Sequence, residues 1–304
     1  MPEAPWVARL GGPFGSALTV DVEEWYHTCL VPDYVNPANR PPLPNELDWL
    51  LPEILDMLAE ARCSATFFVL GEVAERLPGR IREIVEAGHE VGSHGYLHLR
   101  ACERSLPAFR SDIQYGKELL EDLVGEPVLG FRAPEWSLRS LGSLRLPVVA
   151  EAGFLYDSSL TPCPLTGRPG NPRYASRLRF QRFQDDAVPD LLEFPPLTFC
   201  GPLRLPAGSW TGRLVNPERL VRAAADHVEE GGMPVAVVHP WEISGRPTPG
   251  ALSGIARFIH ETGRLSFLPR FRELLRGIPW TSIRTAAGLE TAARGIELAS
   301  RRAG

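Results

Sequence analysis

Short apolar runs alternate with amphipathic segments along most of the chain, and this alternation limits its fold more than any other feature. Apolar runs of about four to eight residues between turn-forming residues are typical of buried strands, whereas longer stretches with a period of about 3.6 are typical of helices. Strands that alternate with helices form parallel sheets. The sequence therefore predicts an α/β fold built from βα units.

The expected strands and helices follow one another along the chain. We expect strands at residues 18–22, 65–70, 89–93, 128–131, 191–194, 235–238 and 280–283. We expect helices at residues 46–60, 81–87, 106–123, 147–152, 217–230, 250–261 and 270–275. Two longer irregular stretches, 31–44 and 161–189, are predicted to be rim loops and not domain boundaries.

Length and composition favour one large domain. The chain has 304 residues, of which 44% are hydrophobic and 23% charged, which is typical of a globular protein. We expect the main domain at residues 17–285, an N-terminal segment at 1–16, and a terminal helix or tail at 286–304. No apolar run has the length of a membrane span, and residues 1–16 lack the apolar core of a signal peptide. We therefore expect a cytoplasmic protein without a transmembrane segment.

Charge and cysteine content argue against several classes of protein. The chain has 32 basic and 37 acidic residues, a net charge of -5, and no basic block that could neutralise a run of phosphates. We therefore expect no nucleic-acid partner. The five cysteines are widely spaced without a CxxC pair, which favours reduced thiols over a disulfide framework or a cysteine metal site. None of these features predicts an oligomeric state.

Acidic residues close the first expected strand, in the run Asp21-Val22-Glu23-Glu24. Side chains alternate between the two faces of a strand, so Asp21 and Glu23 fall on one face and Glu24 on the other. Two carboxylates would then point into one pocket. Charged residues directly after a strand are also common as solvated turn residues, so this cluster alone leaves both interpretations open.

Two histidines follow the third expected strand. His94 and His98 are four residues apart, so on a helix they would share one face and could direct a ring nitrogen at the same ion. With Glu23 they make a set of two histidines and one carboxylate, the usual open arrangement of a catalytic zinc site. A pair with this spacing also arises by chance, so the prediction of a divalent metal site depends on all three residues.

Arg132 and His239 each stand at the end of a further expected strand. Arg132 is either part of a surface ion pair or a fixed fork that holds a carboxylate. His239 is either a turn residue or a site residue, because strand ends carry the sites of α/β folds. Among the other histidines, His27 could border the site, whereas His227 and His260 lie on expected helices and are expected to be exposed.

These motifs, in this order and spacing, resemble those of a known family. LTVDVEE, CSATFFVLG, GHEVGSHGYLH, FRAPEW and VVHPWE are similar to motifs of the polysaccharide deacetylases of carbohydrate esterase family four, which share the chitooligosaccharide deacetylase homology domain. The resemblance runs from about Leu18 to Ile283, and DVEEWYH, GFLYDSS and HPWE resemble the branch found with bacterial exopolysaccharide gene clusters. It implies a distorted (β/α) barrel of about seven strands, a divalent metal that is usually zinc, and hydrolysis of an N-acetyl group from an amino sugar.

The resemblance also implies roles for individual residues. It gives Asp21 as the catalytic base, Arg132 as the arginine that holds the base, and His239 as the general acid. It gives His94 and His98 as metal ligands, together with a carboxylate of the first motif; many members have two adjacent aspartates there, whereas here Val22 follows Asp21 and a glutamate must take that place.

That glutamate is Glu23 by strand alternation, or Glu24 if the strand has already turned. Pro134 matches the proline of the family's third region. After this proline the family commonly has a tyrosine whose backbone N–H faces the oxyanion, and here Glu135 stands in that place.

Substrate contacts and the support of the general acid have weaker signals. Aromatic faces suit sugar rings, so we expect Trp136 and Trp210 to bind the carbohydrate substrate, although a buried tryptophan is more often part of a core. The aspartate that supports the general acid in the family has no clear match, and Glu193 is the candidate here.

Three functions remain open at this point. The first is a metal-dependent hydrolase that removes an N-acetyl group from an amino sugar in a poly- or oligosaccharide or its precursor. The second uses the same residues on another amide, such as a formamido sugar, a lipid-linked sugar or a ring amide, because loops and not the fold select the substrate. The third is a metal-free carbohydrate-binding protein with the same fold.

Overall fold

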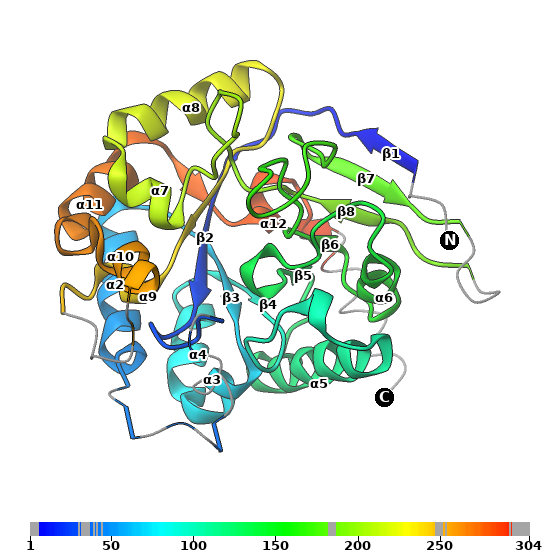
Figure 1. Ribbon diagram of the computed structural model, residues 1–304, viewed down its shortest axis with the longest axis horizontal. Helices are drawn as coiled ribbons and strands as arrows, with labels where there is room; N and C mark the ends of the chain where they lie inside the picture. The colour runs from blue at the N-terminus through cyan, green and yellow to red at the C-terminus, as the bar shows by residue number, and fades with distance from the viewer. Residues whose placement is uncertain are drawn as a thin grey trace.

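Parallel strands form the centre of the molecule, and helices cover its outside (Figure 1). The structure is a computed structural model. It describes residues 6–29, 31, 37–38, 40, 42–43, 45–181, 187–246, 252, 254–291 and 293.

The central strand is β2 (Ser16–Val22), in which all seven residues are buried. It pairs in parallel with β3 (Thr66–Val69), β9 (Val235–Val238) and β10 (Trp280–Thr281). A strand covered on both faces requires an almost continuous apolar sequence, which explains why the run up to Asp21 contains no charged residue.

The sheet continues in parallel from β3 through four more strands. These are β4 (Glu90–Ser93), β5 (Gly130–Phe131), β6 (Tyr156–Asp157) and β8 (Leu191–Glu193). Two antiparallel strands extend the sheet beyond β8, namely β7 (Ser176–Arg179) and β1 (Trp6–Arg9). Because β7 lies within the stretch 161–189, the expectation that this stretch is irregular throughout is wrong; its alternating polar sequence SRLR suits an antiparallel strand near an edge.

The sheet closes on itself between β8 and β9. The N–H of Leu197, just after β8, donates to the carbonyl of Val235 at 2.9 Å, and Gly208 bridges in parallel to Val237. A Cβ at Gly208 would collide with the carbonyl oxygen of Val237, so glycine allows this close approach. β2, β3, β4, β5, β6, β8 and β9 thus enclose a distorted barrel, and the predicted (β/α) barrel is confirmed.

Amphipathic helices pack their apolar faces against the barrel and share one hydrophobic core with it. They are α2 (Leu47–Ala61), α4 (Pro78–Glu86), α5 (Leu106–Val124), α6 (Arg145–Glu151), α8 (Pro217–Glu229) and α11 (Phe267–Gly277). All six lie within a few residues of expected helices, because each carries a helical period of apolar residues.

Shorter helices and turns connect these elements near the ends of the strands. They are α3 (Gly71–Arg76), η1 (Ala101–Glu103), η2 (Pro134–Trp136), α7 (Ser209–Leu214), α9 (Pro240–Ile243), α10 (Gly254–Glu261), η3 (Arg264–Ser266) and α12 (Ile283–Ala286). Only α10 was expected, and the predicted start of that helix at residue 250 lies outside the described residues.

The termini and the first rim loop are described in part. β1 places residues of the expected N-terminal segment 1–16 at the edge of the sheet, so this segment contributes to the fold. Residues 292 and 294–304 of the expected terminal helix or tail, and residues 32–36, 39, 41 and 44 of the first rim loop, lie outside the described residues.

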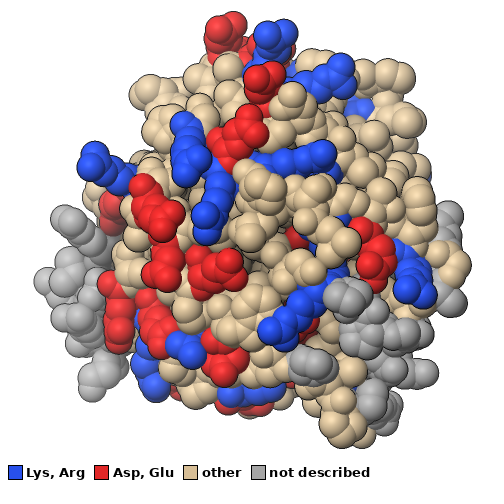
Figure 2. Space-filling view, turned by 90° about the vertical axis from the view of Figure 1, so that its left-hand side faces the viewer, with Lys and Arg blue, Asp and Glu red and all other residues tan. Residues whose placement is uncertain are grey.

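Charged side chains of both signs are interspersed on the face shown in Figure 2. Positive charge on this face therefore forms no stripe of the kind that follows a phosphate backbone. Among the described helices, none has the length and apolar character needed to cross a membrane. The five cysteines are free.

Candidate metal and catalytic site

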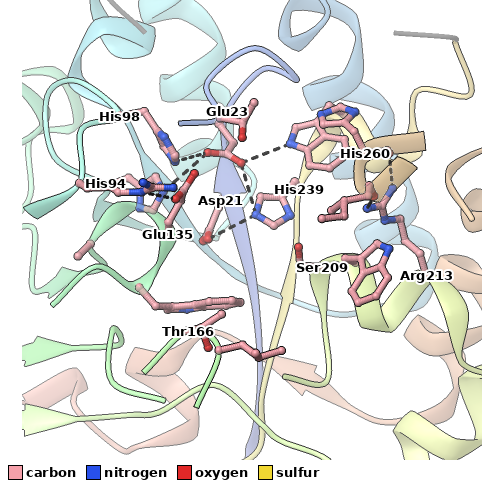
Figure 3. A pocket seen from close by; sticks show the side chains of 18 of the residues that line it. Asp21, Glu23, His94, His98, Glu135, Thr166, Ser209, Arg213, His239 and His260 are labelled. Atoms are coloured by element: carbon pink, nitrogen blue, oxygen red, sulfur yellow. Dashed lines mark hydrogen bonds and ion pairs between the residues drawn. The ribbon is translucent and has the colours of Figure 1, made fainter. Parts of the chain in front are cut away.

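A pocket of about 400 Å³ opens at the carboxyl ends of the barrel strands. In α/β barrels, side chains at these strand ends converge on one site. Here they include Asp21 at the end of β2 and Glu23 just after it, His94 after β4, and His239 after β9 (Figure 3).

Glu23, His94 and His98 form a compact cluster of buried metal-ligand groups. Their candidate ligand atoms all lie within 4.8 Å of one another. Oε2 of Glu23 lies 2.7 Å from Nε2 of His98 and 3.9 Å from Nε2 of His94.

The two histidines meet without a helix. The expectation that they share a helical face is wrong, because residues 94–98 form an irregular loop after β4. Gly95 adopts the left-handed conformation with φ of 82°, which turns the chain, and Asp112 on α5 accepts the N–H of Tyr96 at 3.0 Å. The loop brings the two imidazole rings to 5.3 Å between centroids.

These three residues fit a divalent cation. The ring of His94 donates from Nδ1 to the carbonyl oxygen of Arg132 at 2.8 Å, which leaves its Nε2 as an electron-pair donor toward the cluster. Oε2 of Glu23 is buried and faces both imidazole rings. Such an oxygen is costly to bury unless a cation binds it, and two imidazoles with a carboxylate are typical ligands of catalytic zinc.

The electrostatics of the cluster also favour a cation. Burial alone would raise the pKa of Glu23, but the facing imidazoles of His98 and His239 lower it. Burial lowers the pKa of His94 to about 4. Burial also disfavours the charged form of His98, yet the Glu23 carboxylate raises its pKa to about 10. Positive charge is therefore stabilised between these groups, and a metal ion can supply it in place of a proton.

Glu24 points away from the cluster. Its carboxylate accepts the N–H groups of Glu46 and Leu47 at 3.2 Å each, at the start of α2, and lies 3.5 Å from Arg76. Burial raises the pKa of Glu24 to about 7. Glu24 thus satisfies the first N–H groups of α2, whereas Glu23 lies among the histidines.

Arg132 holds Asp21 inside the barrel. Its Nη1 donates to Oδ1 of Asp21 at 2.6 Å and to Thr19 at 2.7 Å, while Nε and Nη2 donate to Ser158 at 3.1 and 2.8 Å. The guanidinium lies over the ring of Phe68 at 4.3 Å and is fully buried. Of the two interpretations of Arg132, the structure shows the fixed fork that holds a carboxylate.

His239 faces Asp21 and the metal cluster from the other side. Its Nε2 lies 3.8 Å from Oδ2 of Asp21 and 3.4 Å from Oε1 of Glu23. Its backbone N–H and its Nδ1 both lie 2.9 Å from Oε2 of Glu242. Burial alone would lower the pKa of His239, but the carboxylates of Glu242 and Glu23 raise it to about 9.

Glu242, and not Glu193, is the carboxylate that binds the ring of His239. Glu193 accepts the N–H of Leu160 at 3.0 Å, and burial together with the neighbouring Asp157 raises its pKa. The expectation for Glu193 is therefore wrong. The sequence carried a signal for Glu242, because a glutamate three residues after a helix-capping residue is the spacing of a capping box, which α9 has.

The expected substrate residues lie around the pocket with one exception. Glu135, Trp136 and Trp210 line it, while Pro134 is buried and does not. Glu135 and Trp136 both adopt left-handed conformations, with φ of 52° and 51°. The carboxylate of Glu135 accepts from Nε of Arg100 at 2.7 Å, which fixes this wall of the pocket.

Two histidines that were expected on the surface are buried. His260 stacks on Trp241 at 4.0 Å and lines the pocket, and His227 stacks on Tyr174 at 5.0 Å. The expectation of exposure is wrong for both, because α10 and α8 turn these side chains inward. His27 does border the site, since its ring stacks on that of His98 at 6.4 Å.

Two family models match adjoining parts of the chain. Residues 47–146 match a model described as polysaccharide deacetylase, and residues 158–288 match a domain of unknown function (DUF3473). His94, His98 and Arg132 lie in the first match, while Arg213, His239 and Glu242 lie in the second.

Curated relatives match shorter segments. A peptidoglycan-N-acetylglucosamine deacetylase of Bacillus cereus is 39% identical over 83 residues, which are 27% of this chain and 38% of the relative. A peptidoglycan deacetylase of Helicobacter pylori is 31% identical over 110 residues, which are 36% of each chain. A chitooligosaccharide deacetylase of Sinorhizobium fredii is 53% identical over 55 residues, 17% of this chain and 26% of the relative. The matches thus span well under half of each relative.

One solved structure resembles nearly the whole chain. It comes from a Mycobacterium smegmatis protein assigned as a polysaccharide deacetylase, with a TM-score of 0.56 and 22% identity. The similarity covers 98% of this chain and 96% of that one. At this identity the likeness establishes the fold.

Proposed function

The chain belongs to the polysaccharide deacetylase family, and from that premise we propose that it is a metal-dependent hydrolase of N-acetylated amino sugars. Its substrate in this proposal is an N-acetyl group on a poly- or oligosaccharide or on a precursor of one. Zinc is the proposed ion, held by Glu23, His94 and His98. The proposed setting is the synthesis of an exopolysaccharide.

The observation that carries this proposal is the convergence of three kinds of group in one pocket. A cluster fit for a cation lies beside a buried carboxylate, Asp21, and a histidine, His239. Amide hydrolysis needs these three functions together: polarisation of the carbonyl, removal of a proton from water, and protonation of the leaving amine.

The proposed metal supplies electrophilic chemistry. When bound, a divalent ion polarises the amide carbonyl and lowers the pKa of water. Asp21 accepts the proton of the attacking water, and Arg132 orients this carboxylate through the 2.6 Å contact. The backbone N–H of Glu135 is the proposed donor to the oxyanion.

His239 completes the proposed reaction by proton donation to the leaving nitrogen. Glu242 binds the Nδ1 hydrogen of the ring, so Nε2 faces the pocket beside Asp21. Without this proton the amine would have to leave as an anion, and the tetrahedral intermediate would return to substrate. Trp136 and Trp210 are the proposed walls for the sugar ring.

The test uses metal-loaded protein and oligomers of N-acetylglucosamine as probes, with N-formylated oligomers in parallel. We expect about one zinc ion per chain by elemental analysis, and acetate release together with a matching mass loss from the sugar. Protein stripped of metal by a chelator is the control and should release none. Formate release alone would assign the site to another amide. Sugar binding without metal or hydrolysis would make the chain a carbohydrate-binding protein.

A further inference from the structure

Arg213 is a buried arginine without a role in the reaction proposed above. It belongs to α7 and only 1% of its surface is exposed. Its Nε lies 2.9 Å from Oε1 of Glu242, whereas Oε2 of the same carboxylate binds His239. One carboxylate therefore connects the guanidinium of Arg213 to the imidazole of His239.

The other nitrogens of the guanidinium hold a different helix. Nη1 donates to the carbonyl of His260 at 2.6 Å, and Nη2 donates to the carbonyl of Ile259 at 2.8 Å. Both carbonyls lie in the last turn of α10, where a helix leaves carbonyls unpaired and favours positive charge. Only the planar fork of arginine can serve Glu242 and both carbonyls at once; lysine carries the charge without the fork.

The two helices that Arg213 joins also form part of the pocket. Ser209 and Trp210 of α7 line it, as do Ile259 and His260 of α10. A shift of either helix would therefore move the guanidinium, and the guanidinium would move the carboxylate that orients His239.

We propose that Arg213 is a positioning residue that fixes Glu242, and through it the imidazole of His239, to the pocket wall formed by α7 and α10. The inference rests on the proposed function, since it concerns the general acid of that reaction. The positive charge of Arg213 acts on the carboxylate of Glu242. Its Nη1 and Nη2 atoms hold α10 through the carbonyls of His260 and Ile259. These two actions separate in the variants below.

The main test is a double-mutant cycle with Arg213→Gln and Glu242→Gln, measured as acetate release from N-acetylglucosamine oligomers. We expect each single variant to lower kcat by about tenfold or more. Because Arg213 acts through Glu242, the double variant should be about as slow as the slower single variant. If the two effects multiply in the double variant, or if Arg213→Gln keeps kcat within about twofold, the inference is wrong.

Arg213→Lys separates the charge from the fork. We expect its kcat within about threefold of wild type, because lysine still faces Glu242, and a KM raised by about fivefold or more, because Ile259 and His260 lose their donors. A normal KM with a lowered kcat would contradict the assignment. Arg257→Gln, which removes an exposed arginine from α10, is the matched control and should leave both constants unchanged.

A second readout is independent of turnover. The ¹⁵N NMR signals of the His239 ring in wild type should show a protonated Nδ1, and Arg213→Gln should shift population away from that form. If the ring signals are the same in both proteins, the inference is wrong. If wild type releases no acetate from the probes, the proposed function fails while this comparison still decides the role of Arg213. If Arg213→Gln does not fold, Arg213→Lys takes its place in this measurement. The His239 ring signals of Arg213→Lys should match those of wild type, and altered signals would overturn the inference.

Discussion

The two sides of the pocket hold their functional groups by different means. On one side, Glu23, His94 and His98 come from the chain directly after β2 and β4, two strands whose positions are fixed by pairing to β3. On the other side, His239 depends on Glu242 for its orientation, and Glu242 is held by Arg213 from a separate short helix.

The side with Glu23, His94 and His98 is called the metal side, and the side with His239 and Glu242 the acid side. The two differ in the number of strands and helices that must be in place to position their functional groups. The metal side needs parallel strands in register and one left-handed glycine to bring its ligands together. The acid side needs α7, α9 and α10 in place at once, and two of these helices have only six and four residues. Helices this short derive their stability from tertiary contacts and not from their own sequence. The acid side is therefore the more sensitive to distant substitutions.

The largest effect is expected when a metal ligand is removed. His94→Ala and His98→Ala should each lose both the metal and all measurable acetate release, because an open site with two remaining ligands binds an ion poorly. Elemental analysis of the purified variants checks the metal. Full metal occupancy in both variants would show that the cluster is not the metal site.

Glu23 and Glu24 provide the matched control for the same side. Glu23→Ala should lose the ion, while Glu24→Ala should keep it and lower the free energy of unfolding by about 1 kcal/mol, since α2 loses its cap. Elemental analysis and urea unfolding distinguish the two. The reverse result would assign the ligand role to Glu24.

The next largest effect is expected when either proton-transfer group is removed, namely Asp21 beside the metal cluster or His239 on the acid side. Asp21→Asn and His239→Ala should both retain the metal and lower kcat by about 10²–10⁴, the usual range for loss of a general base or acid. The measurement is acetate release at saturating metal. An unchanged rate for His239→Ala would remove this residue from the reaction and leave the acid side without a function.

A smaller effect tests which carboxylate serves the acid side. Glu242→Gln should lower kcat by about tenfold or more, because an amide holds the Nδ1 hydrogen of His239 less strongly than a carboxylate does. Glu193→Gln is the control and should stay within about threefold of wild type, since burial raises the pKa of Glu193 and favours its neutral form. Equal losses in both variants would mean that the pocket responds to any buried change.

The smallest expected effect concerns stability in acid. Burial lowers the pKa of His227 to about 4 from an ordinary value of 6.5, so between these pH values the unfolded chain binds more protons than the folded one. The stability from neutral His227 is complete above pH 6.5 and is lost as the pH falls toward 4. Urea unfolding at pH 7 and pH 5 should show about 1–2 kcal/mol less loss in His227→Gln than in wild type. An identical loss would place His227 in contact with solvent.

The metal side could be predicted from the sequence, since its groups adjoin strands. Buried strands carry continuous apolar runs, and the residues that follow them at the carboxyl ends must converge, so Asp21, Glu23 and His94 could be placed together. The alternation of side chains also separates Glu23 from Glu24, and in the structure Glu23 faces the histidines while Glu24 faces the start of α2. The loop that brings His98 to His94 could not be predicted, because its shape depends on Gly95 and on a contact with α5.

The acid side could be predicted only in part. His239 ends an apolar strand and was visible for that reason, but its partners depend on packing. Arg213 and His260 stand on segments whose sequences suit an exposed helix as well as a buried one, and tertiary contacts decide between the two. Glu193 was a reasonable candidate by chemistry, yet the barrel directs it toward Asp157.

The closure of the barrel also has a consequence for how the chain reaches its native state. β2 pairs with β9 and β10, so residue 17 meets residue 235 and residue 16 meets residue 280. Contacts between residues so distant in sequence carry a large loop-closure entropy and slow folding. During synthesis, the strand that carries Asp21 must wait until more than two hundred further residues have been made. Until then the edge of β2 that will pair with β9 remains open to wrong partners, so chaperone binding should concentrate on nascent chains that end before β9.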